Sequence, residues 1–68
     1  MKNYHATVHH PKTNKIIFEA QVYANDPGDA HAKIEKYLTS IGKDDIAKLG
    51  AILMEIGSRR MTGIPLIE

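Results

Sequence analysis

The chain has 68 residues, which predicts one small domain over 1–68, and such a domain buries only about 60% of the surface that its unfolded chain exposes. Nine Lys and Arg against eight Asp and Glu give a net charge of +1, so charge alone does not indicate a polyanion-binding protein. There is no cysteine, which excludes disulfides and thiolate zinc sites and is compatible with a reducing cytosol. The start has no signal-peptide pattern and no stretch approaches the ~20 apolar residues of a membrane span, so we expect a cytoplasmic protein without a membrane partner.

Residues 4–24 have the alternation that is typical of two antiparallel strands. Apolar and polar side chains alternate over 4–10 and again over 16–24, with a polar stretch between them. Pro11 has no amide hydrogen and suits the point where a strand ladder stops. A turn centred near Thr13 fixes the register of the hairpin. The predicted opposite pairs are Tyr4 with Val22, Ala6 with Ala20 and Val8 with Phe18.

A helix is predicted over 27–41. Asp26 can cap the free amides, Pro27 fits the first helical position, and Asp29 places a second carboxylate in the first turn. Gly42 is a natural end, since glycine accepts the left-handed conformation that terminates helices. One apolar stripe at helical spacing consists of Ala30, Ile34, Tyr37, Leu38 and Ile41.

Residues 46–56 are apolar or small except for Lys48 and Glu55, and the segment 44–56 permits two interpretations. As a helix, it starts at an Asp44 cap and ends at Gly57, and its composition and length favour this state. As a strand, 51–56 joins the hairpin as a third member. Gly50 weakens the helical interpretation, because glycine costs a helix about 1 kcal/mol relative to alanine.

These elements predict an α+β domain in which an antiparallel β-hairpin is followed by two helices packed on one face (β-β-α-α). The alternative is β-β-α-β, with 51–56 as the third strand. The tail, 58–68, contains three aliphatic residues near its end, which is unusual for a free terminus. It is expected either to dock on the hydrophobic layer, or to form a short edge strand or a peptide-like arm that grips a neighbour, with Pro65 marking an edge.

The sequence predicts no metal, no cofactor and no small-molecule substrate. His5 and His9 share a strand face but lie about 13 Å apart at strand rise, so they cannot chelate one zinc ion alone. Ser40 and Ser58 adjoin expected helix ends, and capping explains the acids at the helix starts. No phosphate-binding loop or nucleophile elbow is present, so we expect a protein that is not an enzyme.

Basic residues at the hairpin tip indicate one possible contact with nucleic acid or an acidic partner. Lys12, Asn14 and Lys15 lie in the turn and can reach phosphates. Arg59 and Arg60 add to this surface if they fold nearby.

Surplus apolar side chains without a catalytic set indicate assembly instead. A two-stranded hairpin alone is marginal in water, which favours pairing with a second copy or with another strand. The face of the hairpin away from the helices carries Ile17 and Tyr23 as contact candidates. The candidates for assembly are Ile52, Leu53, Met54 and Ile56.

In size and plan, hairpin then helix, the chain resembles the small α+β proteins of bacteriophages and mobile elements, including anti-CRISPR inhibitors. The resemblance implies an inhibitor that occupies a partner's surface, and it carries over no functional residue. We therefore expect a non-enzymatic binding module that forms a homodimer or occupies a surface on a protein or nucleoprotein partner. The alternative is a small DNA- or RNA-binding regulator that uses the hairpin tip.

Overall fold

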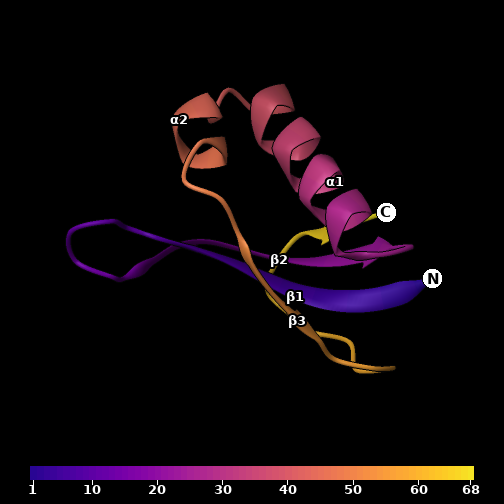
Figure 1. Ribbon diagram of the computed structural model, residues 1–68. Helices are drawn as coiled ribbons and strands as arrows, with labels where there is room; N and C mark the ends of the chain where they lie inside the picture. Colours follow the sequence, from indigo (N-terminus) through magenta and orange to yellow (C-terminus); the bar gives the residue numbers. More distant parts are fainter.

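The computed structural model describes all residues, 1–68, and has the predicted α+β class (Figure 1). The elements are β1 (Lys2–His9), β2 (Ile16–Ala24), α1 (Pro27–Ser40), α2 (Asp44–Ala47), β3 (Ile52–Glu55) and β4 (Leu66–Ile67). The four strands form one sheet with the order β3-β1-β2-β4, and the long helix α1 lies across one of its faces.

The hairpin register is the predicted one. Tyr4 lies opposite Val22, Ala6 opposite Ala20 and Val8 opposite Phe18, and the register shifts between Val8 and His9. The alternation of side chains fixes this register, because a slip by one residue would turn the whole apolar set towards solvent. Beyond the shift, the hairpin tip extends past the rest of the molecule (Figure 1).

Helix α1 begins where the sequence signals predict. The Asp26 carboxylate accepts a hydrogen bond of 2.8 Å from the Asp29 backbone N–H, and Pro27 occupies the first turn. The chain leaves the helix after Ser40 through Gly42, which has a φ of 76°. The side chains that α1 buries against the sheet are Ala30, Ile34 and Leu38.

The helix predicted over 44–56 is wrong beyond its first turn. Only Asp44–Ala47 is helical, its N-cap is Lys43, and no side chain caps it, so Asp44 is not the cap. Gly50 turns the chain with a φ of 79°, and Ile52–Glu55 then pairs antiparallel with β1. The alternative, with a third strand in 51–56, is therefore closer to the structure, whose full order is β-β-α-α-β-β. The free edge of β1 explains the outcome, since a helix over 44–56 would leave the backbone groups on that edge without partners.

The tail adds the fourth strand to this chain's own sheet. β4 pairs parallel with β2, and the Gln21 N–H donates to the Pro65 carbonyl at 2.9 Å. Ile67 is buried within the core, so the tail both docks on the hydrophobic layer and forms a short edge strand. Between β3 and β4 the chain crosses from one edge of the sheet to the other.

The core lies between α1 and the sheet. Only 14 of 68 residues are buried, and several large apolar side chains remain exposed at the surface. The core cluster consists of Tyr4, Ala6, Ala20, Val22, Ala24, Ala30, Ile34, Leu38 and Ile67.

Candidate functional site

The face of the sheet opposite α1, here called the open face, has no helix over it (Figure 1). Because side chains alternate along a strand, residues next to each core residue point to this face. The residues that the alternation and register place there are Asn3, His5, Thr7, His9, Ile17, Glu19, Gln21, Tyr23, Ile52, Met54 and Leu66.

One part of the open face is closed by hydrogen bonds to the crossing segment. Asn3 and Gln21 are only 5% and 1% exposed. The Asn3 amide N–H groups donate to the carbonyls of Gly57 and Arg59, at 3.0 and 2.6 Å. Gln21 donates to Asn3 Oδ1 at 2.8 Å and accepts from the Met61 N–H at 2.9 Å. We call Asn3 and Gln21 the amide clamp, since together they fix the segment that joins β3 to β4.

Sequence reasoning missed the amide clamp, because alternation places both residues on the face that faces away from the helix. One signal was present: asparagine is depleted in strands, so Asn3 inside a strand pattern indicates a specific role. A primary amide also both donates and accepts, which suits a crossing backbone.

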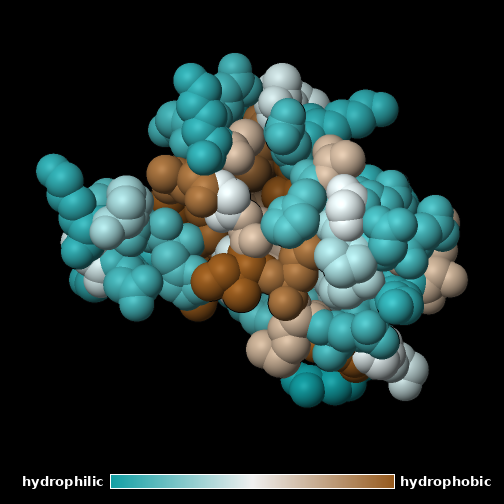
Figure 2. Space-filling view, viewed as in Figure 1, coloured by the Kyte–Doolittle hydropathy of each residue, from teal (hydrophilic) through white to brown (hydrophobic).

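The other part of the open face is exposed and apolar along β3. Ile52 and Met54 are 62% and 60% exposed. The registers place Ile52 beside Thr7 and Met54 beside His5, and His5 in turn contacts the Glu19 carboxylate. Figure 2 shows hydrophobic atoms gathered over β3 and α2, next to the hydrophilic hairpin tip.

The backbone of β3 is unpaired on its outer side. The Ile56 N–H donates to the Asn3 carbonyl at 3.0 Å, so Ile56, Met54 and Ile52 direct their backbone groups towards β1. In an antiparallel ladder the intervening residues direct theirs outward. The outward-directed backbone groups therefore belong to Ala51, Leu53 and Glu55.

The two edges of the sheet differ in how they are protected. Natural edge strands avoid adventitious pairing through short length, proline, lysine or bulges. β4 has only two residues and follows Pro65. β3 is longer, pairs with β1 without a register shift, and contains neither proline nor lysine. The β3 edge is therefore the one that remains open to a further strand.

The predicted assembly residues do not form one surface. Ile52 and Met54 are exposed on β3, whereas Leu53 is half-buried against the core and Ile56 is buried. Ile17 is exposed on the open face, but β1 separates its strand from β3. Tyr23 is half-buried at the end of β2 opposite Asn3.

The predicted basic residues fall at opposite ends of the sheet. Lys12, Asn14 and Lys15 are exposed at the hairpin tip, beyond the His9 end of β1. Arg59 lies at the other end, because its carbonyl binds Asn3, and Arg60 follows it. His9 lies six positions along the strand from Asn3, which is about 20 Å. The hairpin tip and the two arginines therefore do not make one basic surface.

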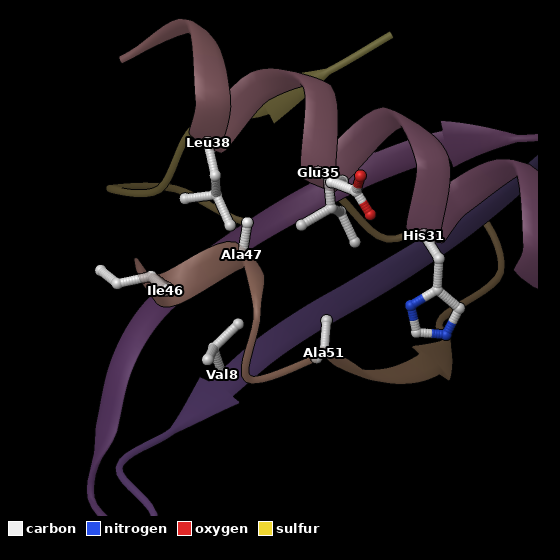
Figure 3. A pocket seen from close by; sticks show the side chains of 9 residues that line it. Val8, His31, Glu35, Leu38, Ile46, Ala47 and Ala51 are labelled. Atoms are coloured by element: carbon white, nitrogen blue, oxygen red, sulfur yellow. The ribbon is translucent and has the colours of Figure 1, made fainter. Parts of the chain in front are cut away.

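A small cavity lies between α1, α2 and β1 (Figure 3). Its volume is about 80 Å³, well below the ~300 Å³ at which pockets for organic ligands begin. Its walls are mainly aliphatic, with His31 and Glu35 of α1 at one side. No group of three or more His, Cys, Asp or Glu side chains is arranged to hold a metal ion.

Comparisons with protein-family models, with curated proteins and with solved structures gave no match. None of the helices has the length and apolar character that crossing a membrane requires.

Proposed function

We propose that this protein is a non-enzymatic binding module that associates with protein surfaces through β3. The observation that carries the proposal is the exposure of Ile52 and Met54 on a strand whose outer backbone is unpaired. The module acts by occupying a partner's surface, in the manner of an inhibitor. The proposal places this action in the cytoplasm, with which a chain without cysteine is compatible.

Strand addition uses both features of β3. Outward backbone groups supply main-chain hydrogen bonds, and alternate side chains supply apolar contact. Fully burying an Ile or Met side chain contributes about 1.5–3 kcal/mol relative to leaving it exposed. Ile52 and Met54 together therefore offer enough apolar contact to add substantially to a short backbone ladder.

The matched comparison for this proposal uses two pairs of exposed aliphatic residues. We expect the Ile52→Ser/Met54→Ser variant to lose the proteins that the wild type captures from its native cell. The Ile16→Ser/Ile17→Ser variant removes two exposed aliphatic side chains from β2 instead, and should capture the same proteins as the wild type. Equal capture by all three proteins would refute a role for β3.

A second candidate function is DNA or RNA binding through the hairpin tip. The supporting observation is that the exposed tip, with Lys12 and Lys15, projects beyond the rest of the molecule (Figure 1). A two-stranded ribbon can enter a major groove. Titration of duplex and single-stranded nucleic acid at low and high salt tests this function, because phosphate binding weakens steeply with salt. Absence of binding at low salt would exclude it.

A further inference from the structure

We propose that two copies of this chain pair through β3, antiparallel and centred on Leu53, so that their sheets join into one continuous sheet. This inference rests on the proposed function, in which β3 is the binding edge, and it names a second copy as the occupant. The segment 51–55 is self-complementary in its backbone groups and in its side chains, and neighbouring registers fit less well.

The backbone groups of β3 are placed correctly for this register. A two-fold axis perpendicular to the sheet, passing beside Leu53, sets Leu53 opposite Leu53 of the second copy. The same axis sets Ala51 opposite Glu55. These three residues are the ones whose N–H and C=O groups point outward, so each facing pair exchanges two hydrogen bonds. The axis keeps both α1 helices on the same side of the joined sheet.

The side chains are complementary in the same register. Ile52 of one copy lies opposite Met54 of the second, on the open face, so the two exposed apolar side chains of β3 cover each other. On the helix side, Leu53 meets Leu53. Glu55 faces Ala51 of the second copy, so the only charged residue of the segment is not placed opposite the same charge.

Pairing shifted by one residue in either direction fits less well. Centring the pair on Met54 places Leu53 opposite Glu55 and draws Gly57 into the ladder. Centring it on Ile52 draws Gly50 and Leu49 into the ladder. Gly57 and Gly50 have φ values of 63° and 79°, which are incompatible with extended strand backbone. The Leu53 register pairs all three outward-directed residues, Ala51, Leu53 and Glu55, without using either glycine.

Disulfide trapping tests the register directly, because the native chain has no cysteine. In the Ala51→Cys/Glu55→Cys variant, each new cysteine faces its counterpart in the second copy. Opposite Cα atoms in hydrogen-bonded pairs are about 5.5 Å apart, within the range of a disulfide. Within one chain the two positions are about 13 Å apart and cannot bridge. We expect rapid formation of a covalent dimer under mild oxidation.

The single variants Ala51→Cys and Glu55→Cys are the matched controls. In the proposed register each cysteine is about 13 Å from the same cysteine in the second copy, so neither variant should crosslink readily. Fast crosslinking of the double variant alone supports the proposal. Equal crosslinking of a single variant, or none in the double variant, overturns the register.

A second measurement does not depend on cysteine geometry. Glu55→Pro removes an outward N–H that makes no bond within the chain, and proline is tolerated on an outer edge. Each dimer then loses two hydrogen bonds, so the dimer dissociation constant measured by analytical ultracentrifugation should rise about tenfold or more. Glu55→Gln should leave this constant unchanged. A wild type that stays monomeric at every concentration overturns self-pairing, whereas loss of captured partners in the Ile52→Ser/Met54→Ser variant would still support β3 as a binding edge.

Discussion

The two faces of this sheet are closed by different physical means. Under α1, Ala6, Ala20 and Val22 are fully buried by apolar contact. On the open face, Asn3 and Gln21 are almost as completely buried, but there the crossing segment covers them and hydrogen bonds hold it in place. Burial alone therefore does not identify the core of a small domain. On one face the loss of a side chain opens a cavity, and on the other it leaves backbone groups without partners.

The largest effect is expected on the helix-covered face. Leu38→Ala should lower the free energy of unfolding by about 2–5 kcal/mol, because Leu38 is fully buried and its truncation leaves a cavity. Urea unfolding followed by circular dichroism measures the change. Thr39→Ala, at the exposed neighbouring position, is the control and should stay within about 0.5 kcal/mol of the wild type. Equal stability of both variants would show that α1 does not cover this face.

An intermediate effect is expected at the amide clamp. Gln21→Ala should cost about 1–3 kcal/mol, because Asn3 and the Met61 N–H lose a buried partner. Glu19→Ala, on the same strand and face, removes only the contact with His5 and should cost about 1 kcal/mol or less. If Gln21→Ala proved no more harmful than Glu19→Ala in urea unfolding, hydrogen bonding would not be what closes the open face.

For the turn at Gly50, which leads from α2 into β3, the sign of the change in stability is decisive. Gly50→Ala should destabilise the fold by about 1–2 kcal/mol, because Gly50 has a φ of 79° that other L-residues adopt at a cost. The surrounding space is open, so no clash adds to this cost. In a helix over 44–56, the same change would stabilise by about 1 kcal/mol. Thermal unfolding distinguishes the two, and a raised midpoint would restore the helical interpretation.

The smallest effect is expected at the hairpin tip, which belongs to neither closed face. Lys12→Glu with Lys15→Glu should change the free energy of unfolding by no more than about 0.5 kcal/mol, because both side chains are exposed. Chemical denaturation tests this, and lost stability would give the turn a structural role.

Local patterns predicted the parts of the fold that depend on neighbouring residues. The register of the hairpin follows from alternation around one turn, and the start of α1 follows from Asp26 and Pro27. The state of 44–56 required knowledge that β1 has a free edge, which is a property of the assembled sheet. Gly50 carried the contrary signal, but the helix-favouring residues around it outweighed it.

The candidate surface could be predicted only in part for the same reason. Ile52 and Met54 were identified by apolar character, but separating them from Leu53 required the pairing with β1. The burial of Asn3 depends on a segment more than fifty residues away, which has no periodic pattern of its own. The position of Arg59 at the far end of the sheet from Lys12 follows from that same contact.

The amide clamp also has a consequence for the order of folding events. Asn3 is 54 and 56 positions away from the residues whose carbonyls it binds, whereas the hairpin and α1 are built from neighbours. Closing so long a loop costs entropy before its contacts form, so the clamp is expected to assemble after the rate-limiting barrier. Gln21→Ala should then accelerate unfolding while leaving the refolding rate nearly unchanged.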